Sequence, residues 1–85
     1  MGAYFKITAA AVIGQGCAQG EHNYIVYENG RGEIHVNAMF RLQGGTFTCC
    51  TYYDRYLCAD RKALKTLTKQ QINDTAYGAF MDGAR

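Results

Sequence analysis

Residues 23–42 read NYIVYENGRGEIHVNAMFRL, and this stretch decides the fold. Its first five residues, 23–27, combine β-branched and aromatic side chains, which is typical of a strand. Asn29 and Gly30 form the strongest short hairpin signal, because both residue types accept positive φ. From Glu33 to Leu42 apolar and polar side chains alternate, which predicts a second strand with one buried face and one face in water. The stretch therefore predicts an antiparallel hairpin.

The flanking segments extend this hairpin into a sheet. An apolar run from Ala3 to Ile13 predicts a strand before it, and residues 14–22 then indicate a glycine-containing loop. After a turn at residues 43–45, residues 46–53 predict a further strand. We therefore expect a sheet of about four antiparallel strands, joined as a meander by short turns.

The last part of the chain predicts helices. Asp60 is placed to cap a short helix that runs through Lys65 or Leu67. Thr68 and Gln71 have the spacing of a capping box, which marks the start of a final helix. The predicted fold class is α+β, with an antiparallel sheet that one or two C-terminal helices cover on one face.

Length and composition narrow the functional classes. A chain of 85 residues predicts a single domain spanning residues 1–85. Nine Lys and Arg against seven Asp and Glu give a net charge of +2, too weak for a dedicated nucleic-acid protein and inconsistent with an acidic DNA mimic. No stretch approaches the ~20 apolar residues of a membrane span, and the N-terminal apolar run lacks a signal-peptide cleavage site. We expect a cytoplasmic protein with reduced thiols and no membrane association.

The spacing of cysteine and histidine argues against a metal site and against catalysis. Cys49 and Cys50 are adjacent, so on a strand they point to opposite faces, and no C-x₂₋₄-C pair is present. His35 alternates with apolar neighbours, so we expect it on the water-exposed face of its strand as an ordinary polar residue. Acidic residues are scattered over turns and helix ends, where capping explains them. The sequence predicts no enzyme, no metal and no cofactor.

Tyrosine and arginine side chains suggest a surface for a protein partner. These residue types are enriched at binding hot spots, because each joins a large contact area to a polar group. Alternation places Tyr52 and Tyr53 on opposite sides of the sheet, so at least one belongs to the core. Together with Tyr4, Tyr24 and Tyr27, such residues would form an aromatic platform on the exposed sheet face. The alternative is that tyrosines merely suit strands. The predicted partner-binding residues are Tyr27, Glu28, Asn29, Arg31, Tyr52, Tyr53, Arg55 and Tyr56.

A basic stripe supports an alternative function. Arg61, Lys65 and Lys69 recur every four residues, so on one helix they share a face that can reach phosphates, although a solvated face is the usual explanation. The alternative is a small nucleic-acid-binding or regulatory domain that stacks bases on sheet tyrosines. Its predicted contact residues are Arg61, Lys62, Lys65 and Lys69. A homodimer formed through an exposed strand edge is a third hypothesis.

The hairpin segment Ile25-Val26-Tyr27-Glu28-Asn29-Gly30 resembles a stretch in a family of small phage-encoded anti-CRISPR proteins that act on type I-F systems. In that family, too, a VYENG segment leads into an alternating, charged strand. The resemblance covers six of the 85 residues, and neither the flanking sequence nor the cysteine-rich fourth strand matches. It implies a stoichiometric inhibitor that docks on a CRISPR-Cas complex in the host cytoplasm and blocks DNA binding or nuclease recruitment. The residues that carry over, Val26 to Gly30, are structural.

Overall fold

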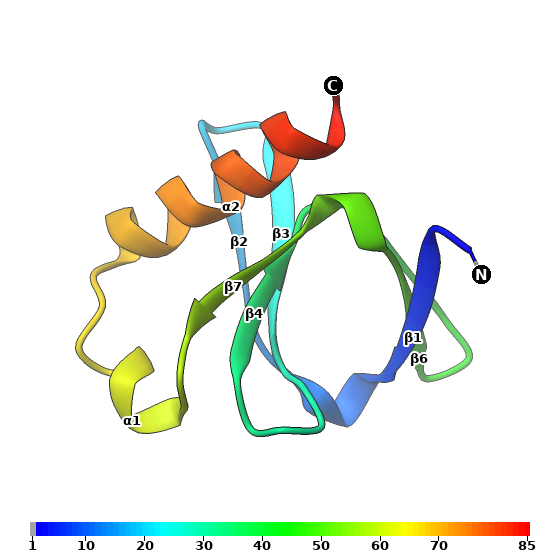
Figure 1. Cartoon of the computed structure of the whole chain (residues 1–85), viewed down its shortest axis with the longest axis horizontal. Helices are drawn as coiled ribbons and strands as arrows, with labels where there is room; N and C mark the ends of the chain where they lie inside the picture. Colours follow the sequence, from blue (N-terminus) through cyan, green and yellow to red (C-terminus); the bar gives the residue numbers. More distant parts are fainter. Residues whose placement is uncertain (1) are drawn as a thin grey trace.

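The computed structural model describes residues 2–85 and contains two antiparallel sheets, with helices against one of them (Figure 1). The three-stranded sheet has the order β1-β6-β5, with strands Tyr4–Thr8, Thr46–Cys50 and Phe40–Gln43. The four-stranded sheet has the order β2-β3-β4-β7, with strands Val12–Ala18, His22–Glu28, Ile34–Asn37 and Asp54–Cys58. The predicted α+β class with antiparallel strands is confirmed.

The chain passes between the two sheets at three bends. These are the 3₁₀ turn η1 (Ala9–Ala11), residues 38–39, and the 3₁₀ turn η2 (Thr51–Tyr53). The first two bends each divide a segment that the sequence indicates as one strand, whereas η2 takes up the last three residues of the predicted strand 46–53. The strand β7 that follows η2 was not predicted. The strands therefore number seven in two sheets, where about four in a meander were expected. The reason is physical: an apolar pattern continues through a bend, because the halves on both sides of it still bury side chains.

Residues 14–22, expected as a loop, instead include most of β2. Gly16 pairs with Tyr24 on β3, and a Cβ atom on Gly16 would approach the Tyr24 ring to under 3.0 Å. Gly14 lies against Val26 on the same neighbouring strand. These two glycines therefore give β3 side chains room to lie over β2, which is a role that glycine takes within strands as well as in loops.

The hairpin between β3 and β4 is a five-residue turn, residues 29–33. Asn29 closes it: its N–H donates to the Glu33 carbonyl at 2.9 Å, and its Oδ1 accepts from the N–H groups of Arg31 and Glu33, each at 2.9 Å. The positive φ falls on Gly32, at 82°, so the expectation of positive φ at Asn29 and Gly30 is wrong. The asparagine side chain acts here as a local acceptor for a longer turn.

The four-stranded sheet is the middle layer of the molecule. On β3, Tyr24 and Val26 belong to the core against the helices, whereas Ile25 and Tyr27 belong to the core between the two sheets. All four side chains are buried, none more than 5% exposed. The predicted water-exposed face is therefore wrong for this hairpin, because the three-stranded sheet covers the face that the helices leave open.

Two C-terminal helices, α1 (Arg61–Leu64) and α2 (Lys69–Gly83), cover the other face of the four-stranded sheet (Figure 1). Asp60 caps α1 by accepting a backbone N–H at 2.8 Å. Thr68 and Gln71 form the predicted capping box at the start of α2. The expectation of C-terminal helices packed on one sheet face is confirmed. Within residues 2–85, no helix has the length and apolar character that a membrane span requires.

Candidate functional site

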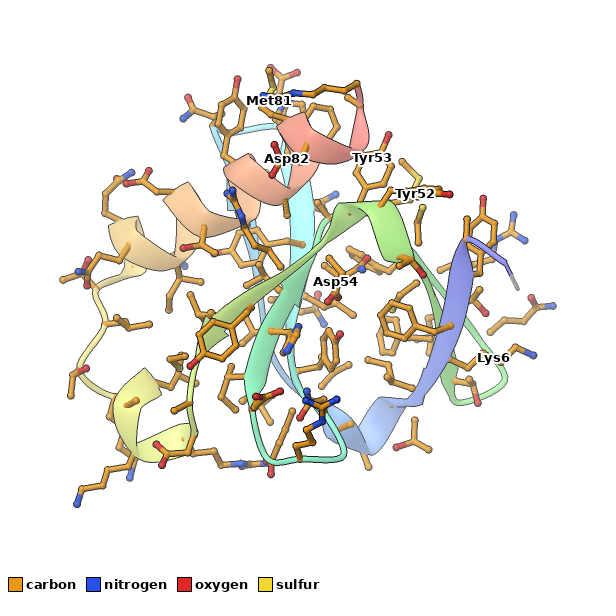
Figure 2. All side chains as sticks on the ribbon, in the orientation of Figure 1. Lys6, Tyr52, Tyr53, Asp54, Met81 and Asp82 are labelled. Atoms are coloured by element: carbon orange, nitrogen blue, oxygen red, sulfur yellow. The ribbon has the colours of Figure 1, made fainter. Side chains whose placement is uncertain are left out.

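A network of polar side chains lies between the two sheets, centred on Asp54 at the start of β7. Its Oδ1 accepts hydrogen bonds from the Tyr27 hydroxyl at 2.7 Å and from the Asn37 amide at 3.1 Å. Its Oδ2 lies 2.8 Å from Nδ1 of His35. Asn37 is fully buried, and its amide also donates to the Cys50 carbonyl at 3.0 Å. The network ties four strands of the two sheets together beside the bend at η2, where Figure 2 labels Asp54.

His35 belongs to this network, so its expected position as an ordinary water-exposed residue is wrong. Its side chain is 18% exposed. Nε2 lies 3.3 Å from the Asn29 amide and 3.8 Å from Glu33 Oε1, and the rings of Tyr27 and Tyr56 have centroids 5.6 and 5.9 Å away. The hydrogen bond from Asn29 holds the pKa of Glu33 below its usual range. Alternation correctly placed His35 on the face opposite to Ile34 and Val36, but the three-stranded sheet covers that face.

Burial between the sheets changes the acid strength of two neighbouring groups. The pKa of Tyr27 is raised far above its ordinary value, first by burial and then by the hydrogen bond to Asp54. Burial, and then the charge of Asp54, raises the pKa of the Cys49 thiol to about 11. Both groups are therefore neutral in the folded protein at physiological pH.

Raising the pH from about 8 to about 11 is expected to destabilise the fold. In the unfolded chain the thiol ionises near 9.0, but Cys49 resists ionisation up to about 11 in the folded protein. A raised folded-state pKa contributes stability that is complete below the unfolded value and is lost as the pH rises toward the folded one. For Cys49 the loss is about 2 to 3 kcal/mol. Urea unfolding at the two pH values measures it, and Cys49→Ala should make the response smaller, with the remainder coming from Tyr27, whose pKa is raised as well. An equally steep response in that variant would contradict the assignment.

The predicted partner-binding residues fall in two places, of which the first is the hairpin. Tyr27 is 3% exposed with its ring against the three-stranded sheet, so its predicted contact with a partner is wrong. Glu28 accepts from Nε of Arg61 at 2.6 Å, and Asn29 closes the turn. Arg31 is exposed at the tip of the turn. Of the four predicted residues in the hairpin, Arg31 is therefore exposed to a partner, and the other three make contacts that stabilise the fold.

The second place is the segment from η2 into β7. Tyr52 is 67% exposed and Tyr56 is 51% exposed. Tyr53, between them, is half-buried: its ring lies 6.0 Å from that of Phe80 on α2 and covers Gly83, where a Cβ atom would meet the ring at under 3.0 Å. The sequence expectation that at least one tyrosine here is core therefore agrees with Tyr53.

Arg55 connects this segment to α2. Its guanidinium lies directly over Gly78 and pairs with Asp82 at 3.1 Å. Figure 2 shows Met81 and Asp82 at the same end of the molecule as Tyr52 and Tyr53, and Met81 is 45% exposed. We name this region the η2 surface; it consists of Tyr52, Tyr53, Arg55, Met81 and Asp82. Met81 was not predicted, because its helical spacing beside apolar residues favours burial.

The basic stripe predicted on a single helix is not formed. The helix α1 ends at Leu64, and α2 begins only at Lys69, after the N-cap Thr68. Arg61 pairs with Glu28 on β3. The prediction that Arg61, Lys65 and Lys69 share one helix face is therefore wrong. The capping signal at Thr68, which starts a new helix, outweighs the four-residue spacing of the charges.

The aromatic platform predicted on the sheet is also largely wrong. Tyr24 is 2% exposed and its hydroxyl donates to Asn73 on α2, while Tyr27 belongs to the core between the sheets. Tyr4 is 65% exposed on the three-stranded sheet. One of the three sheet tyrosines is thus available to a ligand.

The cysteines are free, with Cys17 exposed and the other three buried. Within the part of the chain that the structure describes, no three His, Cys, Asp or Glu side chains are grouped so that they could hold a metal ion. Comparison of the chain with protein-family models, with curated proteins and with solved structures finds no match.

Proposed function

We propose that this protein is a non-catalytic inhibitor that acts by binding another protein, and that its partner is a CRISPR-Cas effector complex of a bacterial cell. The observation that carries the binding proposal is the exposure of Tyr52 and Tyr56 on a segment whose intervening residues are anchored. The target class is supported by the resemblance of residues 25–30 to anti-CRISPR proteins of type I-F systems.

The segment between the two exposed tyrosines is held by three kinds of contact. The ring of Tyr53 packs on α2, the carboxylate of Asp54 takes part in the polar network, and Arg55 pairs with Asp82. A rigid aromatic side chain on a fixed backbone loses little conformational entropy when a partner binds. Tyr52 and Tyr56 are therefore suited to act as binding anchors, with Arg55 as a polar contact beside them.

The segment that resembles the anti-CRISPR family contributes the frame of this surface. Val26 and Tyr27 are buried, and Asn29 closes the turn. Tyr27 donates to Asp54, which follows Tyr53 as the first residue of β7. The support from the resemblance thus concerns the scaffold that fixes the η2 surface.

The test is direct binding of the purified protein to a purified type I-F effector complex, followed by target-DNA binding in a gel shift. We expect a stoichiometric complex that no longer retains target DNA. The double variant Tyr52→Ala, Tyr56→Ala should bind about 100-fold more weakly, since each hot-spot tyrosine contributes roughly 1 to 2 kcal/mol. Circular dichroism checks that this variant is folded. Lys62→Ala with Lys65→Ala, two exposed residues on and after α1, is the matched control and should bind normally.

The experiment tests the identity of the target and the position of the binding surface separately. If the protein forms no complex with the effector and leaves its DNA binding intact, the CRISPR-Cas target is rejected. If a complex forms but the tyrosine double variant binds as tightly as the unmodified chain, the target stands and Tyr52 and Tyr56 are rejected as its binding anchors.

A further inference from the structure

The outer face of the three-stranded sheet is uncovered. On β1, β6 and β5 the residues that alternate with the core side chains Phe5, Phe47 and Phe40 point away from the core. Except for Cys50 at the end of β6, which is buried, these outward side chains are exposed or half-buried. They include Tyr4, Lys6, Arg41, Gln43, Thr46 and Thr48. In Figure 2 Lys6 lies beside β1 on the side remote from the helices. This face is therefore free to meet a ligand.

The charge on this face has one sign. The strands β1, β5 and β6 contain the basic residues Lys6 and Arg41 and no acidic residue. Both basic residues pair with Thr48 of the central strand, from opposite sides, so their backbone positions lie two strand spacings apart, about 10 Å. Within residues 2–85 neither makes an ion pair with a carboxylate. The face is thus complementary to a chain of negative charges.

A shallow hollow of about 470 Å³ lies on the same face. Tyr4 and Arg41 line it from the two outer strands, and Thr48 lines it from the central strand between them. Tyr4 is 65% exposed, so its ring is available for stacking, and it is one outward position along β1 from Lys6. An aromatic ring, a small polar residue and two flanking cations are thereby brought together on one surface.

We infer that this face binds single-stranded nucleic acid, with a base stacked on Tyr4 and backbone phosphates at Lys6 and Arg41. Aromatic stacking combined with basic residues along a sheet is the chemistry by which single strands are bound without sequence preference. An acidic protein surface would use the cations, but it would not need a hollow between them. The inference goes beyond the proposed function and does not depend on it.

The test is fluorescence anisotropy of labelled oligothymidylate and oligouridylate with the purified full chain, at about 20 mM salt and upward, with a DNA duplex as a further arm. We expect binding to both single strands. Two phosphate contacts predict that log K falls against log salt with a slope of about −1.4. Loss of stacking in Tyr4→Ala predicts affinity about 5- to 100-fold lower, and Tyr4→Phe, which keeps the ring, should bind normally.

Two double variants distinguish binding at this face from binding that depends only on the net positive charge of the protein. Lys6→Gln with Arg41→Gln should abolish the salt dependence, whereas Lys62→Gln with Lys65→Gln removes the same charge elsewhere and should change little. The inference is overturned if the unmodified chain binds neither oligonucleotide at low salt. It is also overturned if both double variants weaken binding equally, or if duplex or an acidic peptide such as oligoglutamate binds more tightly than the single strands.

Discussion

Replacing Asp54 with alanine is expected to lower the free energy of unfolding by about 3 to 5 kcal/mol. The carboxylate is the shared partner of Tyr27, His35 and Asn37, and its own side chain is 16% exposed. Without it, a phenol and an amide between the sheets lose an acceptor that water replaces poorly. Because small domains are stabilised by only about 5 to 15 kcal/mol, this loss would be a large share of the total. Urea unfolding at neutral pH measures it.

Two further variants show whether the effect comes from the network. Asp54→Asn keeps a carbonyl acceptor, so we expect roughly half of the loss, about 2 kcal/mol. Asp74→Ala removes a carboxylate of α2 that is exposed and bonded only to Gln70 four residues earlier, so its expected cost is within about 0.5 kcal/mol. A cost for Asp54→Ala as small as that for Asp74→Ala would show that the network does not stabilise the fold.

Gly16→Ala is expected to cost about 2 to 3 kcal/mol through overpacking. A Cβ atom at this position would meet the ring of Tyr24 at under 3.0 Å. That ring is 2% exposed, and its hydroxyl donates to Asn73 on α2, so it cannot move aside without losing a hydrogen bond or opening the core. Chemical or thermal unfolding of the variant measures the loss.

The cause can be isolated with a double-mutant cycle. Tyr24→Phe removes the hydroxyl that lies closest to the added methyl group, so Gly16→Ala should cost less in the Tyr24→Phe background. Gly30→Ala is the matched glycine control, since a Cβ atom there meets nothing within 4 Å, and we expect a change within about 0.5 kcal/mol. Equal costs for Gly16→Ala in both backgrounds would contradict the steric explanation.

Local sequence predicted the helices well and the division of the strands poorly. The capping box of Thr68 and Gln71 depends only on residues three apart, so it can be recognised without knowing the fold. Residues 33–42 alternate throughout, and this pattern put Ile34 and Phe40 on one face. The bend at residues 38–39 sends them to different cores, Ile34 against the helices and Phe40 between the sheets. Alternation records burial, not which sheet buries a side chain.

Predicting the candidate site also required knowing where the chain bends from one sheet to the other. The residue types of Tyr52 and Tyr56 were enough to suggest a binding role, but the bend at η2 decides that Tyr52 is exposed and Tyr53 is held against α2. The bonds from Asp54 to Tyr27 and His35 join residues 27 and 19 positions apart in the chain, which no local motif records. The polar network could therefore be seen only once the strands were paired.

The distribution of strands between the two sheets also fixes an order of events during synthesis. Tyr4 pairs with Cys50 and Thr8 with Thr46, so β1 leaves the ribosome well before its partner β6 and stays unpaired until β6 has been made. The neighbouring strands β2 and β3 can pair at once, as local contacts form before distant ones. During this delay Lys6 gives the unpaired strand a charge that discourages pairing with another nascent chain. The face inferred to bind nucleic acid is thus completed late, when its central strand arrives.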